Sequence, residues 1–177
     1  MSNRIKKEIF SWIQVIVMAF IIAFILKTFI FRPVYVKGPS MDPTLSDGQI
    51  LILWKLNYQI GDPNRGDVIV IGEDEDELQN KSLIKRVIGI PGDIIEIKNG
   101  DVYVNNEKLN PDYVKDNTAA NGFSKSVLPN GQYFVLGDNR GESRDSRDKS
   151  VGFIERENIE GKTVFRLWPL NKIGIIH

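Results

Sequence analysis

The feature that most constrains this chain is an apolar run close to its N-terminus. Residues 9–26 contain no charged side chain. As a helix continued to residue 31, the run would be roughly 35 Å long, which matches a hydrocarbon core of about 30 Å with some tilt. The rest of the chain is too small to bury a helix that is apolar on every face in its core. The run therefore predicts a transmembrane anchor at 9–31, preceded by a short N-terminal segment at 1–8.

A cleaved signal peptide is the alternative interpretation of this run, because basic residues precede it. Its apolar core would be unusually long for a signal peptide, and only Phe-Ile-Phe-Arg-Pro follows, with no small-x-small cleavage site. We therefore expect an uncleaved anchor. Basic residues flank both of its ends, so the positive-inside rule alone does not set its orientation.

The charge balance is a sum over two unlike parts. Lys plus Arg and Asp plus Glu each number 23, yet residues 1–32 carry a net charge of +4 and the remainder −4. A neutral total argues against a nucleic-acid partner bound through phosphate contacts. The chain has no Cys, and its single His is the terminal His177. Without Cys, we expect no disulfide, no thiolate catalysis and no Cys-based metal site. With a single terminal His, we expect neither a multi-His metal site nor a Ser-His-Asp triad. Hydrolytic chemistry would therefore need another base.

Residues 32–177 are predicted to form a mostly β domain. Short β-branched and aromatic runs alternate with Gly, Pro and Asp turns, which is typical of about eight strands. These are expected at 34–36, 50–54, 68–71, 83–90, 94–97, 102–104, 133–136 and 163–168. Asn99-Gly100 predicts a tight hairpin, because a type I′ turn needs two residues that tolerate positive φ. We place this hairpin in an inserted subregion at about 98–132.

Three further segments are predicted from their local composition. Residues 154–159 suggest a short helix. The acidic run at 73–77 lacks the Gly turn and the spaced ligands of a calcium loop, so we expect a solvated loop there. The polar segment 108–125 is expected to be a mobile surface excursion.

Three segments of the β-rich part carry groups capable of chemistry. Ser40 stands in a Gly/Pro turn, Lys85 lies in an otherwise apolar strand, and residues 137–147 form a dense polar loop after a strand. Taken singly, they are typical of a turn-forming serine, a solvent-facing lysine and a loop with internal hydrogen bonds. Taken together, in this order behind an anchor, they are much more informative.

The sequence resembles the type I signal peptidases, membrane-bound serine proteases that use a Ser-Lys dyad. Residues 40–45, 85–93 and 137–147 match three motifs of that family in the family's order. The resemblance implies a single N-terminal transmembrane helix followed by a β-rich, signal-peptidase-like catalytic domain, with no cofactor and no metal. It also implies signal-peptide removal from secretory preproteins with small residues at the first and third positions before the cut. The alternative is a catalytically inactive, membrane-tethered binding or scaffold protein of the same fold.

The resemblance assigns Ser40 as the nucleophile and Lys85 as the general base. A lysine titrates near pH 10.4, so its pKa must fall by roughly 3 units for the amine to be substantially neutral near pH 7. Burial among apolar neighbours could cause this, because desolvation penalises the ammonium form. By the same resemblance, Ser143 orients the Lys85 amine by a hydrogen bond. Asp145 and Arg147 are expected to form a supporting ion pair that stiffens their loop.

The oxyanion donor implied by the resemblance is the backbone N–H of Ser40. Some members of the family place a hydroxyl residue two positions before the nucleophile, where this chain has Gly38. The residues that match the family's apolar substrate pockets are Val34, Val36, Leu83 and Ile84. Ordinary core packing explains each of these four equally well.

The implied function also orients the chain in the membrane. Signal peptides are cut after translocation, so we expect a cytoplasmic N-terminus and an extracytoplasmic β-rich domain in the cell membrane. Phe29, Phe31 and Tyr35 could seat this domain at the lipid surface, where aromatic rings are favoured. For Trp54 we expect core packing instead.

Overall fold

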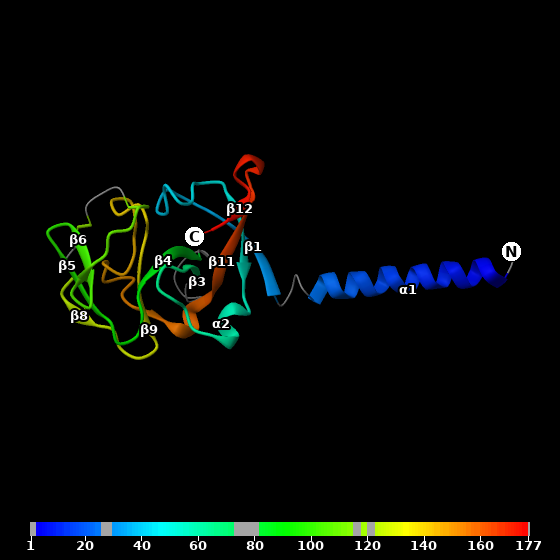
Figure 1. Cartoon of the computed structure of the whole chain (residues 1–177), viewed down its shortest axis with the longest axis horizontal. Helices are drawn as coiled ribbons and strands as arrows, with labels where there is room; N and C mark the ends of the chain where they lie inside the picture. Colours follow the sequence, from blue (N-terminus) through cyan, green and yellow to red (C-terminus); the bar gives the residue numbers. More distant parts are fainter. Residues whose placement is uncertain (1–2, 26–29, 73–81, 115–117, 120–122, 177) are drawn as a thin grey trace.

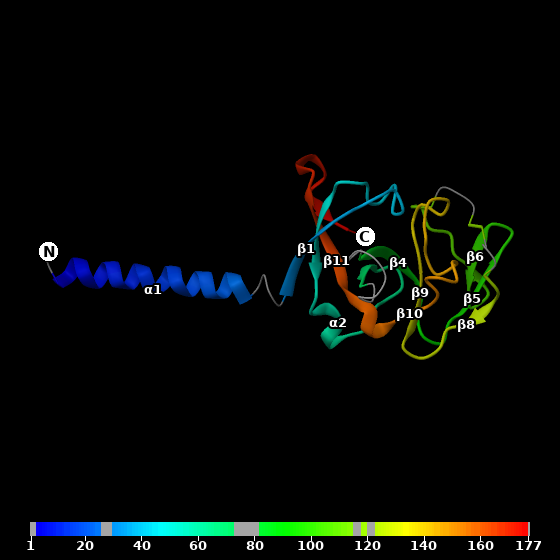
Figure 2. The same cartoon turned by 180° about the vertical axis from the view of Figure 1, so that it is seen from behind.

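The computed structural model describes residues 3–25, 30–72, 82–114, 118–119 and 123–176 of the 177-residue chain. One long helix, α1 (Asn3–Ile25), precedes a mostly β part (Figure 1). The helix projects away from the strands in both views (Figures 1 and 2). Its stretch Lys7–Phe24 is long and apolar enough to cross a membrane, and none of it is buried against the rest of the chain. The mostly β class with one N-terminal apolar helix is confirmed.

The larger sheet follows the order β1-β2-β11-β3-β4-β9-β10, and β12 pairs with β11. All of its neighbouring strands are antiparallel. Its strands are β1 (Phe31–Tyr35), β2 (Ile50–Trp54), β3 (Val68–Ile71), β4 (Leu83–Gly89), β9 (Gln132–Leu136), β10 (Ile154–Glu155), β11 (Ile159–Trp168) and β12 (Gly174–Ile175).

The smaller sheet follows the order β7-β6-β5-β8 and lies at the end far from α1 (Figure 1). Its strands are β5 (Ile94–Lys98), β6 (Asp101–Val104), β7 (Glu107–Lys108) and β8 (Ser126–Val127). The predicted hairpin turn is confirmed, since Asn99 and Gly100 have φ of 51° and 84°. The sheet spans residues 94–127, so it begins earlier than the expected subregion at 98–132 and contains more than one hairpin.

Three short helical segments complete the described elements: α2 (Asn57–Ile60), η2 (Arg156–Asn158) and η3 (Leu170–Lys172). The short helix expected at 154–159 is a 3₁₀ turn between β10 and β11. Its neighbours are strands because Ile154 and Ile159 pair with Tyr133 and Ile71 across the sheet.

Two central strands are covered on both faces. Every residue of β3 is buried, as is every residue of β4 after Leu83. Their unbroken apolar sequence is typical of such strands, whereas a strand with one wet face alternates. Three apolar clusters provide the cover, and they gather residues from both sheets and from the turn after β1. Any polar side chain on β4 must therefore find its partners inside the protein.

Two expectations about single segments are wrong. The 108–125 segment is not simply a surface excursion, because Thr118 is only 2% exposed and Phe123 packs 4.8 Å from Phe134, centroid to centroid. Trp54 is 38% exposed, since it ends a strand beside the sheet edge. The acidic run at 73–77, Phe29 and His177 lie outside the described residues.

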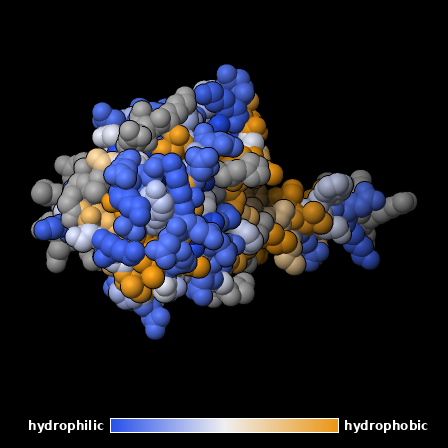
Figure 3. Space-filling view, turned by 60° about the vertical axis from the view of Figure 1, so that its left-hand side comes forward, coloured by the Kyte–Doolittle hydropathy of each residue, from blue (hydrophilic) through white to orange (hydrophobic). Residues whose placement is uncertain are grey.

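The surface of the β-rich part differs from that of α1. Hydrophilic side chains dominate the face of the β-rich part that Figure 3 shows, and apolar ones gather between that face and the N-terminal end of the helix. Large apolar side chains of α1 such as Phe20 and Phe24 are mostly exposed. An apolar helix surface of this length is compatible with a hydrocarbon environment, which is consistent with a membrane anchor.

Candidate active site

The turn that follows β1 holds Ser40. Met41 and Leu45 are almost fully buried and fix this turn in the core. The N–H of Leu45 donates to the carbonyl of Met41 at 2.8 Å, which closes one turn of chain after Ser40. The N–H of Asn139 donates to the carbonyl of Ser40 at 3.1 Å. The serine is therefore held both by its own turn and by the loop that follows β9.

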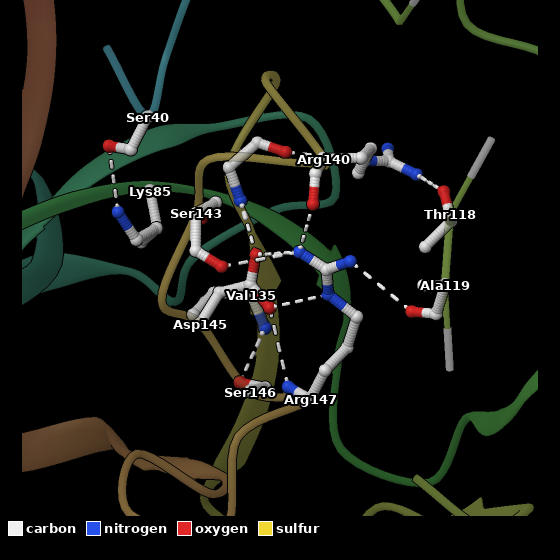
Figure 4. Close-up of polar contacts among 11 residues, drawn as sticks. Ser40, Lys85, Thr118, Ala119, Val135, Arg140, Ser143, Asp145, Ser146 and Arg147 are labelled. Carbon is white, nitrogen blue, oxygen red and sulfur yellow. Dashed lines mark hydrogen bonds and ion pairs between the residues drawn. The ribbon is translucent and has the colours of Figure 1, made fainter. Parts of the chain in front are cut away.

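The side chain of Lys85 points inward from β4, where it is 3% exposed. Its Nζ lies 2.9 Å from Oγ of Ser40, 45 positions earlier in the chain (Figure 4). This placement excludes the solvent-facing interpretation of the lysine. As an ammonium group, Nζ donates to the hydroxyl oxygen, and as a neutral amine it can accept the hydroxyl proton.

The environment of Lys85 brings the neutral amine within reach near neutral pH. Burial lowers the pKa of Lys85 from 10.5 to about 8, because the ammonium form loses its hydration. The charges of Asp145 and Asp138 oppose this shift and the charge of Arg147 assists it. Desolvation is the largest cause, so roughly a tenth of the amine is neutral at pH 7 and about half at pH 8. A group in this state can act as a base near neutral pH.

Two buried ion pairs lie behind this contact. Arg86 holds Asp138 through two bonds, Nε to Oδ1 at 2.9 Å and Nη2 to Oδ2 at 2.7 Å. Arg147 holds Asp145 in the same bidentate way, at 2.8 and 2.9 Å (Figure 4). All four side chains are at most 2% exposed. The pair expected between Asp145 and Arg147 is thus present, and it lies in the interior rather than at the surface.

Ser143 lies beside this network without the bond that was expected of it. Its Oγ is buried and has no hydrogen-bond partner within the described part of the chain, so no bond joins it to Lys85. A Cβ added to Gly137 would lie 2.2 Å from this Oγ and 2.4 Å from the carbonyl oxygen of Ser40. Tight packing against the Gly137 backbone therefore sets the position of the hydroxyl. Only glycine fits at 137.

Two backbone amides next to Ser40 differ in their availability. The N–H of Gly38 donates to Oδ1 of Asp47 at 2.7 Å, so it is already used. The N–H of Ser40 makes no hydrogen bond to any described residue, which leaves it able to donate to an incoming carbonyl oxygen. Gly38 itself has φ of 80°, a conformation that a serine would adopt only with strain.

A cleft of about 640 Å³ opens in front of Ser40 and Lys85. All four residues expected to contact substrate line it: Val34, Val36, Leu83 and Ile84. These side chains also belong to the core clusters, so their inner faces pack and their outer faces line the cleft. Four polar or aromatic residues for which the sequence did not suggest a place in the cleft also line it: Arg32, Tyr35, Lys37 and Ser82.

The sequence interpretation missed the buried partners behind the dyad, above all Arg86 and Asp138. A usable signal was present around Lys85-Arg86. Apolar pairs stand on both sides of these two residues, and neighbouring side chains of a strand point to opposite faces. A strand that is apolar on both faces buries both basic side chains, and a buried arginine needs a carboxylate partner.

The family described as "Signal peptidase, peptidase S26" matches residues 9–168. This match covers most of the chain, including the Ser40 turn, β4 and the loop after β9. The chain therefore belongs to the signal peptidase family, peptidase S26.

Two relatives at 35% and 41% identity agree with this assignment. "Signal peptidase I" of Bacillus licheniformis is 35% identical over 181 residues, covering 97% of this chain and 95% of the relative. "Signal peptidase IB" of Staphylococcus aureus strain COL is 41% identical over 185 residues, covering 94% and 93%. A solved signal peptidase I from Enterococcus faecalis V583 is 30% identical, with a TM-score of 0.45, and the match covers 58% of this chain and 97% of that one.

Proposed function

We propose that this protein is a membrane-anchored type I signal peptidase in which Ser40 is the nucleophile and Lys85 the general base. The observation that carries the proposal is the 2.9 Å contact between Ser40 Oγ and Lys85 Nζ beside the cleft. It is supported by membership of the signal peptidase family and by relatives that bear that name. The lowered pKa of Lys85 supports the role of base.

The proposed reaction proceeds through an acyl-enzyme. Neutral Lys85 takes the hydroxyl proton of Ser40 as Oγ attacks the scissile carbonyl, and the N–H of Ser40 stabilises the negative oxygen. The Lys85 ammonium then gives that proton to the leaving amine, which departs as the mature protein's N-terminus. Lys85 next takes a proton from a water molecule that attacks the ester. It returns this proton to Ser40 Oγ as the signal peptide's carboxylate leaves.

The substrate is proposed to bind as an added strand. β1 is the first strand in the order of its sheet, so one of its edges is open, and residues 83–85 of β4 pair only with β3 among the described strands. An extended peptide can hydrogen-bond to such edges. The apolar lining from Val34, Val36, Leu83 and Ile84 would accept small side chains at the first and third positions before the cut. Secretory preproteins meet these requirements.

The proposed topology follows from this chemistry. α1 spans the cell membrane with the N-terminus in the cytoplasm, and the β-rich part faces outward, where signal peptides emerge after translocation. Protease added to intact, wall-stripped cells should digest the β-rich part, and it should spare that part in inverted vesicles. The opposite pattern would contradict this topology.

The test of the dyad uses the full-length protein in detergent and a labelled preprotein with a small-x-small site. Ser40→Ala removes the nucleophile, and Lys85→Arg keeps a long cation that does not deprotonate near neutral pH. Each should lower kcat/KM by at least about 10³-fold. Matched controls are Ser126→Ala and Lys108→Arg in the smaller sheet, which should cleave normally.

Two outcomes would overturn the proposal. Normal cleavage by folded Ser40→Ala or Lys85→Arg would remove the dyad from the mechanism. A wild-type protein that binds the preprotein without cutting it would identify the inactive binding protein instead.

A further inference from the structure

Three buried arginines lie behind the Ser40–Lys85 contact, and one of them has no carboxylate partner among the described residues. Arg86 and Arg147 are paired with aspartates, whereas Arg140, which is 5% exposed, forms no ion pair with any described residue. Its Nε donates to the carbonyl of Gly137 at 3.1 Å and its Nη1 donates to Oγ1 of Thr118. A buried cation with neutral acceptors alone depends strongly on each of them.

Each of these arginines receives a contact from the segment that joins β7 to β8 of the smaller sheet. The ring of Tyr113 stacks on Arg86 at 4.0 Å. Thr118 accepts from Arg140, and the carbonyl of Ala119 accepts from Arg147 at 3.2 Å (Figure 4). Nothing in the pattern of the sequence links this polar segment to the three arginines.

Thr118 is fixed on the other side by the smaller sheet. Its N–H donates at 2.8 Å to the carbonyl of Gly100, in the turn between β5 and β6. The side chain of Thr118 is thus a buried bridge between that turn and Arg140. A hydroxyl oxygen in this position accepts the guanidinium N–H, while an isosteric methyl group would leave it unsatisfied.

The arginine contacts continue directly to the nucleophile. Arg140 holds the carbonyl of Gly137, whose Cα packs so closely on Ser40 that an added Cβ would lie 2.4 Å from the Ser40 carbonyl oxygen. Arg86 holds Asp138, and the N–H of Asn139 donates to Ser40. A shift of the Gly137–Asn139 backbone therefore moves Ser40 relative to Lys85.

We propose that Thr118 and Tyr113 are positioning residues for the peptidase reaction, a role that rests on the function proposed above. They hold Arg140 and Arg86, and through these the Gly137–Asn139 backbone against which Ser40 is placed. Neither residue lines the cleft. Their loss should therefore reduce kcat, because the distance between Oγ and Nζ is disturbed, and leave KM nearly unchanged.

The decisive variants are Thr118→Val, which keeps the shape and removes the acceptor, and Thr118→Ser, which keeps the hydroxyl. A displacement of about 1 Å at a reacting group can cost about 100-fold in rate, so we expect at least about a 10-fold loss of kcat in Thr118→Val. We expect a KM within about 2-fold of wild type, because substrate binding is untouched. Thr118→Ser should restore kcat.

A matched control separates positioning from stability. Thr163 is a second buried threonine whose hydroxyl makes one hydrogen bond. Its Oγ1 donates to the carbonyl of Val68 at 3.0 Å. Thr163→Val should lose stability to a similar degree, measured as the unfolding midpoint, while kcat per folded molecule stays at the wild-type value. In the second test pair, Tyr113→Leu should lower kcat and Tyr113→Phe should preserve it, because phenylalanine retains the stacking ring.

The outcomes are distinct. Wild-type kcat in folded Thr118→Val, or an equal loss of kcat in Thr163→Val, would overturn the positioning role. If Thr118→Val does not fold, the Tyr113 pair decides, and equal kcat in its Leu and Phe variants would overturn the role. A wild-type protein that fails to cleave would instead overturn the proposed function on which the role rests.

Discussion

Lys85 and Arg86 are neighbours on β4 and point to opposite faces of the strand, where their pKa values shift in opposite directions. Both are at most 3% exposed. Lys85 faces Ser40 and the cleft and forms no ion pair with a described residue, and burial lowers its pKa to about 8. For Arg86, burial alone would lower the pKa, but the bidentate bonds and the charge of Asp138 outweigh it and raise the pKa above its usual value.

The difference shows how one strand supplies both a base and a permanent cation. Desolvation discharges a buried amine when no carboxylate touches it, whereas a bidentate carboxylate keeps a guanidinium charged. The face toward Ser40 is therefore suited to proton transfer and the opposite face to fixed structure. Substitutions that remove the carboxylate from Arg86 or the charge from Lys85 should therefore change stability in opposite directions.

The largest effect is expected from Asp138→Asn, which removes the Asp138 carboxylate from the buried, charged Arg86. Removing one partner of a buried pair costs about 3–5 kcal/mol, so the free energy of unfolding should fall by about that amount. Denaturant unfolding of the full chain in detergent measures it. The control Asp62→Asn breaks the pair with Arg156, in which the Asp62 side chain is 82% exposed, and should change little. A stable Asp138→Asn protein would show that the buried Arg86 does not depend on the Asp138 carboxylate.

Lys85→Met should raise the free energy of unfolding, whereas Asp138→Asn should lower it. A lysine with a folded pKa of about 8 instead of 10.5 destabilises the fold by roughly 3 kcal/mol while it is charged. The penalty is complete below pH 8, falls as the pH rises from about 8 to 10.5 and vanishes above that range. Thermal unfolding at pH 6 should show a clear gain for Lys85→Met, and at pH 10.5 a much smaller one. A gain that does not change with pH would contradict desolvation as its cause.

The smallest effect is expected at an exposed pair of matched length. Nζ of Lys108 lies 2.8 Å from Asp101, the same distance as Nε of Arg147 from Asp145. Lys108 and Asp101 are open to solvent, whereas the other pair is buried. Exposed pairs contribute little because water and salt screen them. Lys108→Ala should leave the unfolding midpoint unchanged within error, whereas Arg147→Met should lower it by several degrees. Equal effects would show that distance, and not burial, sets the strength of these pairs.

Local signals predicted most of the fold. The longer strands have β-branched runs bounded by turn residues, and Asn99-Gly100 marks its own hairpin because both residues adopt positive φ. The two-residue strands β7, β8, β10 and β12 and the four-residue helix α2 were missed, since segments this short show no periodicity. Their pairing is decided by the sheets that they join.

The sequence predicted which residues form the candidate site, but not all of the contacts between them. The order of three motifs pointed to Ser40 and Lys85, yet only the fold brings their side chains together across 45 positions. The expected bond from Ser143 to Lys85 is not formed, because packing against Gly137 fixes the hydroxyl elsewhere. The bond between Arg140 and Thr118 joins the loop after β9 of the larger sheet to the segment between β7 and β8 of the smaller sheet, and no local pattern encodes it.

The central claim, that burial without a carboxylate makes Lys85 a base, can be measured directly. In full-length protein carrying ¹³C at Cε of its lysines, the Lys85 signal is the one that disappears in Lys85→Arg. Its chemical shift should titrate with a midpoint of about 8, well below the ordinary 10.5. A midpoint near 10.5 would contradict the claim, because Lys85 would then remain an ammonium ion throughout the neutral range.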